Sequence, residues 1–388
     1  MLAATREPPL EPAELGRFHG PDIDWSMVRV LASQERLMTV FWPRLERSGL
    51  AVPPEHGGAL RMQTMIGEFQ LGTAEKVLHE VVETCRRLDI DLMLLKGASL
   101  ALTVYSGFHD RPMGDLDVVA HGDDAERLWT ALREEGWALE FEGGGEFYEG
   151  HQHLPPLVWS GGLGVVLEIH RSLLASRTPF LIGEEEWWAS ARRVDFGGHD
   201  VAVLEPGAQL IYLSMHFAWS HTLSRGLART VRDVCAVIAH TAPDWEEVVR
   251  RASAARAASS LYWTLRLAGS LGGAEVPAEV LERLRPSRPN WVLNALERSF
   301  VEAALFRSCP YPRILETLWG LGIDPRGSGH GSSRPWGADE QFRAEVDLPL
   351  EAERPRFTDR LARIPAGLSY LGRVVSGTLG RGRFHADL

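Results

Sequence analysis

The sequence predicts an α/β fold built on a mixed β-sheet, with helices before the sheet and a helical domain after it. Three observations support this prediction. An apolar run at 90–95 passes through a Lys-Gly turn into a short apolar helix at 98–105. Further strand-like runs follow up to residue 170. From residue 206 onward, apolar residues recur every three to four positions, which is typical of helices.

Changes in composition divide the 388 residues into five expected segments. The first segment is rich in Pro and Glu, so we expect it to be frayed. The last holds a Gly- and Ser-rich linker and a basic amphipathic stretch, which either packs on its own protein or contacts a membrane or a partner. The segments are a flexible leader at 1–22, N-terminal helices at 23–70, an α/β core at 71–200, a helical domain at 201–323, and the linker with the basic C-terminal segment at 324–388.

The core is expected to begin with a helix and to end with a β-hairpin. Apolar residues at 60–88 are spaced three and four apart, which predicts a helix. A strand is expected at 116–120, followed by a helix that ends near residue 136 and a strand at 137–141. The runs 151–159 and 165–170 flank a Gly-rich turn and are therefore expected to pair as a hairpin.

The net charge of −11 argues against a nucleic-acid partner, because binding to a phosphate polymer depends on many basic contacts. The sequence has no uncharged apolar run of membrane-spanning length, so we expect a cytoplasmic protein without a transmembrane segment. Its cysteines show neither a disulfide framework nor metal-ligand spacing, and we expect them in the core; they are Cys85, Cys235 and Cys309.

Two aspartates, Asp115 and Asp117, stand two positions apart where a strand begins, directly after Gly114. Alternation along a strand places both carboxylates on one face and Leu116 on the other. The two carboxylates repel each other, and chelation of a divalent cation such as Mg²⁺ relieves this repulsion. The alternative is a pair of solvated aspartates at a strand end.

Glu168 lies inside the apolar run 165–170, where an uncompensated charge would cost several kcal/mol on burial. We therefore expect it to have a partner. The period of two puts Val166, Glu168 and His170 on one face. If this strand lies beside the aspartate strand, Glu168 completes a three-carboxylate metal site; otherwise it pairs with an arginine or faces solvent.

The turn Lys96-Gly97-Ala98-Ser99 is a candidate phosphate cradle. Gly97 would let the backbone approach a phosphate, the helix N-terminus offers free N–H groups, and Lys96 or Ser99 could reach phosphate oxygens. Lys96 is one of only two lysines in the chain. Arg111 could clamp a triphosphate. A plain strand-to-helix turn and a surface arginine are the respective alternatives.

Together these motifs resemble a family of uncharacterised bacterial nucleotidyltransferases in the polymerase-β-like superfamily. The likeness extends over about residues 25–240 and includes a helical segment with His216, His221 and Asp233. Two features depart from the pattern, because Glu168 replaces the usual Asp and the usual Gly-Ser is Lys96-Gly97-Ala98-Ser99. The motifs that carry it are Leu94-Leu95-Lys96-Gly97, Tyr105, Arg111-Pro112-Met113-Gly114-Asp115-Leu116-Asp117 and Leu167-Glu168-Ile169-His170.

The resemblance implies a minimal nucleotidyltransferase core that uses a nucleoside triphosphate, with ATP favoured, and releases pyrophosphate. Asp115, Asp117 and Glu168 would hold two Mg²⁺ ions, with Mn²⁺ as an alternative, and Glu168 would accept the proton from the acceptor. Lys96, Gly97, Ser99, Arg111 and Gly114 would bind the nucleotide. The acceptor is a small molecule, a peptide or a protein.

Two other functions stay open at this point. A degenerate nucleotidyltransferase fold could act as a regulator, for example as an antitoxin, without turnover. His151 and His153 share a strand face and, with His170, could form a three-histidine zinc site of a hydrolase. His216 and His221 are five positions apart, which on an α-helix places them off a common face. Asp233 is expected to pair with Arg229 and Arg232 on its own helix; the alternative is a place in the wall of the acceptor or nucleotide site.

Overall fold

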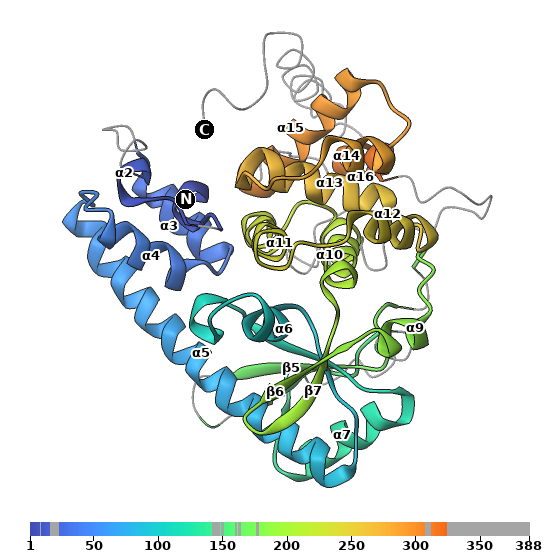
Figure 1. Ribbon diagram of the computed structural model, residues 1–388. Helices are drawn as coiled ribbons and strands as arrows, with labels where there is room; N and C mark the ends of the chain where they lie inside the picture. The colour runs from blue at the N-terminus through green and yellow to red at the C-terminus, as the bar shows by residue number, and fades with distance from the viewer. Residues whose placement is uncertain are drawn as a thin grey trace, which may run out of the picture. The chain divides into compact units, whose positions relative to one another are not determined.

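The computed structural model describes residues 1–7, 9–15, 23–141, 148, 151–159, 161, 164–175, 178–306 and 312–323. The expected linker and basic segment at 324–388 lie outside the described residues. The chain divides into two compact units. Figure 1 shows the helices and strands of both. The first comprises 1–176, 182–210 and 232–244, and the second comprises 177–181, 211–231 and the chain from 245 onward.

The first unit contains a seven-stranded mixed sheet in the order β3-β4-β5-β2-β1-β7-β6. The pairs β2/β5 and β1/β7 are parallel and the other pairs are antiparallel, which confirms the predicted mixed sheet. The β4/β5 hairpin was also predicted. The strands are β1 Met93–Leu94, β2 Asp115–Val119, β3 Ala138–Leu139, β4 Leu157–Trp159, β5 Val165–His170, β6 Arg192–Phe196 and β7 His199–Val203.

The hairpin β6/β7 was not predicted, and it extends the sheet past the expected boundary at residue 200. Phe196 pairs with His199, so Gly197 and Gly198 form a two-residue loop, and both have positive φ (63° and 85°). Such loops need left-handed backbone at both positions, which glycine adopts without steric cost. The Gly-Gly pair was the signal for this hairpin.

Two helices, α5 (Pro54–Leu88) and α7 (Gly122–Glu134), pack on one face of the sheet. The inward face of β2 contributes Leu116 and Val118 to this core, and β5 contributes its odd-numbered residues. Alternation then leaves Asp115, Asp117, Glu168 and His170 for the opposite face. The helix α6 (Lys96–Thr103) follows β1 directly, as predicted.

The N-terminal residues differ from the expected frayed leader. Helix α1 (Leu2–Thr5) packs on α4 (Met38–Arg47). Helices α2 (Pro12–Leu15) and α3 (Trp25–Gln34) lie between them in the sequence. The Glu7 carboxylate is buried and accepts hydrogen bonds from Arg44 (2.9 Å) and Arg232 (3.1 Å). A paired, buried carboxylate holds a Pro- and Glu-rich stretch in place, which composition alone does not reveal.

The second unit is helical, and its core includes a fully buried tryptophan, Trp263. The Trp263 indole donates to the Gly322 carbonyl (3.0 Å), and Trp319 donates to Ala218 (2.6 Å). None of the helices in the described ranges combines the length and the apolarity that a membrane crossing requires. The helices after the sheet begin with α10 Pro206–Met215 and continue as the π-helical His216–Ser220, α11 Leu227–Thr241, α12 Trp245–Ala254, α13 Ala258–Leu267, the π-helical Ala268–Gly272, α14 Ala278–Leu284, α15 Asn290–Phe306 and α16 Pro312–Gly322.

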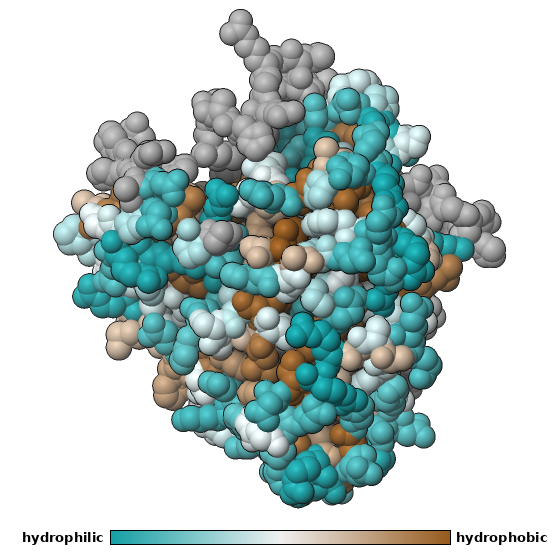
Figure 2. Space-filling model, in the orientation of Figure 1, coloured by the Kyte–Doolittle hydropathy of each residue, from teal (hydrophilic) through white to brown (hydrophobic). Residues whose placement is uncertain are grey.

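Exposed apolar side chains among the described residues include a set on α5. Figure 2 shows a face on which hydrophilic residues predominate and apolar residues are interspersed. On α5, Met62, Met65, Ile66 and Phe69 are exposed at spacings of three and four, so they form one stripe of the helix.

A buried ion pair links the loop before β2 to α11 within the first unit. Arg111 donates from Nε and Nη2 to the two carboxylate oxygens of Asp233 (2.6 and 2.7 Å). Tyr105 also donates to Asp233 (3.0 Å), and the Arg232 guanidinium lies 4.3 Å from the Tyr105 ring centroid. The expectation that Asp233 pairs along its own helix is therefore corrected, because a bidentate, buried pair with Arg111 is stronger than an exposed helix pair.

We expect Asp233→Ala to lower the free energy of unfolding by about 3–5 kcal/mol, because it leaves the Arg111 guanidinium buried without a counter-charge. The matched control is Asp91→Ala, which removes the exposed pair with Arg193 (2.6 Å) and should cost less than about 1 kcal/mol. Chemical denaturation of both variants measures the difference. Equal losses would show that the buried pair does not hold this loop.

Candidate active site

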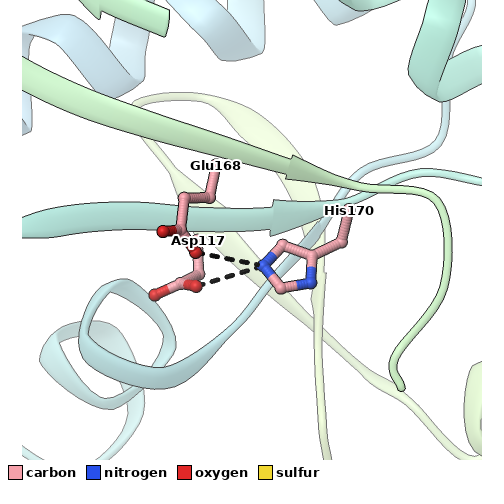
Figure 3. Close-up of side chains that lie close together, drawn as sticks. All are labelled: Asp117, Glu168 and His170. Carbon is pink, nitrogen blue, oxygen red and sulfur yellow. Dashed lines mark hydrogen bonds and ion pairs between the residues drawn. The ribbon is translucent and has the colours of Figure 1, made fainter. Parts of the chain in front are cut away.

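The parallel pairing of β2 with β5 brings the acidic residues together. Asp117 stands directly opposite Glu168, and Asp115 stands opposite Val166. Because side chains alternate along both strands, Asp117, Glu168 and His170 project from the same face. Figure 3 shows the two carboxylates and the His170 ring turned toward one another from neighbouring strands.

These three side chains are close enough to hold one cation. One ligand atom from each of Asp117, Glu168 and His170 lies within 4.8 Å of the others. The Asp117 side chain is only 3% exposed, whereas that of Glu168 is 22% exposed, so Glu168 lies on the open side of the cluster. Asp115 is half-buried at the start of β2.

Asp117 already has two basic partners. The Lys96 ammonium lies 2.6 Å from Asp117 Oδ1, and His170 Nε2 lies 3.1 Å from the same oxygen. Burial alone would raise the pKa of Asp117, but the charge of Lys96 and the hydrogen bond to His170 hold it well below its usual range. Burial likewise opposes charge on His170, yet its hydrogen bonds to Asp117 and Glu168 raise its pKa.

The turn that carries Lys96 is built by close packing of two motifs. A Cβ on Gly97 would lie 3.0 Å from the Met113 Cβ and 3.4 Å from an Arg111 nitrogen. Gly97 thus lets α6 approach the loop before β2. Lys96 itself has a positive φ of 44°, and no side chain caps the N-terminus of α6. Left-handed backbone at a non-glycine residue is a strained conformation that concentrates at functional sites.

Arg36 is a site residue that the sequence analysis missed. A Cβ on Gly114 would lie 0.9 Å from Arg36 Nη1, so the guanidinium lies directly against Gly114, next to Asp115. Arg36 is exposed and also has a positive φ of 54°. Nothing in the sequence between α3 and α4 marks this arginine, because its position depends on how the N-terminal helices pack.

Glu140, at the end of β3, was also missed. Its pKa is raised by burial and by the negative charges of Glu168 and Asp115, and Arg36 partly offsets this. It therefore belongs to the same electrostatic cluster. A carboxyl group whose pKa is raised by neighbouring negative charges lies where a bound cation is stabilising.

Two predicted nucleotide contacts already have partners elsewhere in the first unit. Ser99 is 1% exposed, and its hydroxyl accepts a hydrogen bond from the Gln209 side chain (2.9 Å). Arg111 is 5% exposed and is committed to Asp233. Burial in α6 keeps Ser99 from solvent, and the ion pair with Asp233 occupies Arg111, whose Nη1 lies 3.4 Å from the position that a Cβ on Gly97 would take. Arg36 and Lys96 are the basic residues at the acidic cluster.

The histidines form a row of rings beside the carboxylates. His153 bridges to His170, and its Nε2 lies 3.9 Å from Glu168 Oε2. The rings of His151 and His153 are 4.1 Å apart. Burial lowers the pKa of His153 and lowers that of His151 to about 3. In the described part of the chain, the metal-ligand grouping is two carboxylates with His170, not the three histidines considered for a zinc hydrolase.

His216 and His221 provide another correction. Their rings lie 4.6 Å apart, although five positions separate them. The intervening segment is π-helical, and the His221 N–H donates to the His216 carbonyl (3.2 Å). A π-turn bonds residues five apart and so brings them onto one face, whereas the sequence analysis assumed an α-helix.

The site thus combines carboxylates on the sheet edge with two basic side chains beside them. Asp115, Asp117 and Glu168 supply oxygen ligands of the kind that Mg²⁺ prefers. Lys96 and Arg36 lie at the same edge and can contact phosphate oxygens. The combination suits a substrate that brings both a metal ion and a polyphosphate.

Comparisons with known proteins agree with this chemistry at the level of family. A family described as uncharacterised nucleotidyltransferase matches residues 21–273, which is more than half of the chain. No curated protein matches the sequence. Among solved structures, an antigenic nucleotidyltransferase-like protein from Paracoccidioides brasiliensis is similar at 18% identity and a TM-score of 0.34, over 55% of this chain and 97% of that chain. By its family match, this chain is a member of the uncharacterised nucleotidyltransferases.

Proposed function

We propose that the protein is a metal-dependent enzyme that transfers a nucleoside monophosphate from a nucleoside triphosphate, with ATP favoured, to an acceptor hydroxyl. The observation that carries this proposal is the in-register parallel pair Asp117–Glu168, with Asp115 on the same strand face, in a chain of the nucleotidyltransferase family. This arrangement favours a core of the polymerase-β-like superfamily.

The residues present fit a pair of divalent cations. Asp115, Asp117, Glu168 and Glu140 concentrate negative charge on one edge, and burial together with the charges of Glu168 and Asp115 raises the pKa of Glu140. The Lys96 ammonium, 2.6 Å from Asp117, shows that a cation is stable at this position. Asp115, Asp117 and Glu168 would hold Mg²⁺ or Mn²⁺, which would supply positive charge that stabilises the leaving pyrophosphate.

In the proposed reaction, the acceptor oxygen forms a bond to the α-phosphorus, and the bond from that phosphorus to the β-phosphate oxygen breaks. Pyrophosphate leaves with the bonding electron pair. Glu168 is the exposed carboxylate of the cluster, so it is placed to accept the acceptor's proton. Asp115 and Asp117 hold the cations, and both sit on a strand that restricts their movement.

The nucleotide's phosphates are expected to lie between Lys96 and Arg36. Lys96 starts α6, whose first N–H groups have no side-chain cap and can donate to a phosphate. Arg36 lies against Gly114, beside Asp115, and offers a forked set of donors. These two residues take the part that the sequence assigned to Ser99 and Arg111.

The acceptor is proposed to be a small molecule, a peptide or a protein. The net charge of −11 argues against a long nucleic acid, because the acidic surface repels its backbone.

A catalytically silent, regulatory protein is the second candidate. One observation favours it: Lys96 and His170 already neutralise Asp117, as expected of a carboxylate that no longer binds metal. The two candidates differ in turnover. A silent protein would bind a metal-bound nucleotide analogue without releasing pyrophosphate with any acceptor.

Asp117→Asn should reduce nucleotide transfer by at least about a hundredfold, because loss of a metal ligand removes several kcal/mol of transition-state stabilisation. Transfer of a labelled α-phosphate into cell extract, with release of pyrophosphate, measures the effect. Mass analysis of the labelled product identifies the acceptor.

Two further variants make this test decisive. Glu168 is less buried than Asp117, so Glu168→Gln serves as a second test if the Asp117 variant misfolds. Thermal unfolding checks whether each variant is folded. Asp200→Asn alters an exposed carboxylate on β7 and should leave transfer unchanged. Normal transfer by folded Asp117→Asn and Glu168→Gln proteins would rule out the proposed enzyme.

Arg36→Gly should raise the KM for the nucleoside triphosphate by roughly 10- to 150-fold with a smaller change in kcat. A hydrogen bond to a charged group contributes about 1.5–3 kcal/mol, and each 1.4 kcal/mol corresponds to about a factor of ten. Glycine keeps the left-handed backbone at φ 54°, so the variant removes the guanidinium without adding strain. Steady-state kinetics measures both constants.

Gly114→Ala provides an independent check, because its Cβ would occupy the place of Arg36 Nη1 and push the guanidinium aside. It should raise KM in the same direction, and the two changes together should not add fully. Arg86→Ala, on the exposed face of α5, is the control. An unchanged KM in Arg36→Gly would remove Arg36 from the nucleotide site.

A further inference from the structure

Two histidine nitrogens converge on one oxygen of Glu168. His153 Nε2 lies 3.9 Å and His170 Nε2 lies 3.7 Å from Glu168 Oε2. His170 Nε2 is also 3.1 Å from Asp117 Oδ1. Both imidazoles therefore face the same carboxylate edge from neighbouring segments.

The His153 ring is held in the tautomer that suits metal binding. Its Nδ1 lies 2.8 Å from the Leu154 carbonyl oxygen. Because a carbonyl only accepts, Nδ1 carries the hydrogen, and in the neutral ring the lone pair is then on Nε2, which faces Glu168. A backbone carbonyl that fixes the other ring nitrogen is a common support for a histidine ligand.

The backbone fixes both rings in place. The isolated bridge between His153 and His170 sets the two segments side by side, and the Leu154 N–H donates to the Ile169 carbonyl (2.9 Å). Alternation along β5 keeps Glu168 and His170 on one face. The two rings are thus held on neighbouring segments, and His170 would give up the Nε2 hydrogen that it donates to Asp117 when an ion binds.

The separations match the size of a coordination sphere. Metal bonds of about 2.0–2.2 Å to histidine and carboxylate ligands place adjacent ligand atoms roughly 3.0–3.5 Å apart. The distances of 3.1 Å from His170 to Asp117 and 3.7 Å from His170 to Glu168 need shifts of only a few tenths of an ångström. His153, 3.9 Å from Glu168, lies outside the group of mutually close ligand atoms and must turn toward His170 to join it. Side-chain rotation supplies such shifts.

We propose that Glu168, His153 and His170, with Asp117 shared, form a binding site for a first-row transition ion of the Mn²⁺, Co²⁺ or Zn²⁺ class in preference to Mg²⁺. Imidazole nitrogens suit these ions, whereas Mg²⁺ favours an all-oxygen shell that retains water. The oxygen-only pair Asp115 and Asp117 is left for Mg²⁺. The inference rests on the proposed function for its role in transfer, but binding of the ion does not depend on turnover.

The test uses the full chain, stripped of metal by chelation. Calorimetric titration with Mn²⁺, Co²⁺, Zn²⁺ and Mg²⁺ gives each affinity, and we expect the transition ions to bind at least about tenfold more tightly than Mg²⁺. Spin-echo resonance of bound Mn²⁺ should show coupling to histidine nitrogen in the unmodified protein. Absence of that coupling, or equal affinity for Mg²⁺, overturns the site.

Variants identify the ligands. His153→Phe keeps a ring of similar volume but removes the nitrogen, and it should weaken transition-ion binding at least about tenfold while leaving Mg²⁺ binding unchanged. His170→Asn should do the same, and it serves as a second variant if the first unfolds. His240→Ala, an exposed histidine on α11, is the control.

The outcomes separate this site from the enzyme proposal. If bound Mn²⁺ shows coupling to histidine nitrogen but no metal supports nucleotide transfer, the metal site is kept and the transferase is rejected. Transfer with bound ions that lack nitrogen coupling would keep the transferase and reject the site. Unchanged Mn²⁺ affinity in folded His153→Phe and His170→Asn proteins would also reject it.

Discussion

The in-register parallel pairing of β2 and β5 is the constraint on which the site depends. It puts Asp117 opposite Glu168, although 51 positions separate them in the sequence. A register shift of one residue would turn Glu168 into the core that α5 and α7 cover, where its charge would be buried without a partner. The apolar residues Leu167 and Ile169 therefore fix the carboxylate's position as firmly as Glu168 itself does.

Gly97 and a buried ion pair hold the turn and the loop that flank this sheet edge. Gly97 allows α6 to pack on Met113, and that contact sets where Lys96 begins the helix. Arg111, in the same loop, is anchored by Asp233. Residues that resemble phosphate contacts in the sequence thus form the scaffold, while Lys96 faces Asp117. Motif resemblance locates a site more reliably than it assigns the task of each residue.

The sequence predicted features that depend on local periodicity and missed those that depend on long-range packing. Alternation within a strand gave the shared face of Asp115 and Asp117, and turn residues gave the β4/β5 hairpin. Arg36 could not be predicted, because a helical lead-in brings it to Gly114 only after folding. The π-helical turn at His216 has no periodicity signal that distinguishes it from an α-helix in the sequence.

The charge balance at Asp117 connects the two proposals. Lys96 and His170 both contact Oδ1 of this carboxylate, and they offset the cost of burying it. Under the proposed function, a divalent ion at the same oxygen would replace part of that interaction, so metal binding would be an exchange and not a simple addition. The Lys96 ammonium released from Asp117 would then lie at the N-terminus of α6, where a triphosphate would supply the negative charge it has lost. Under the proposed function, metal and nucleotide therefore stabilise each other's binding through Lys96, as linkage requires of two ligands that share one coupled group.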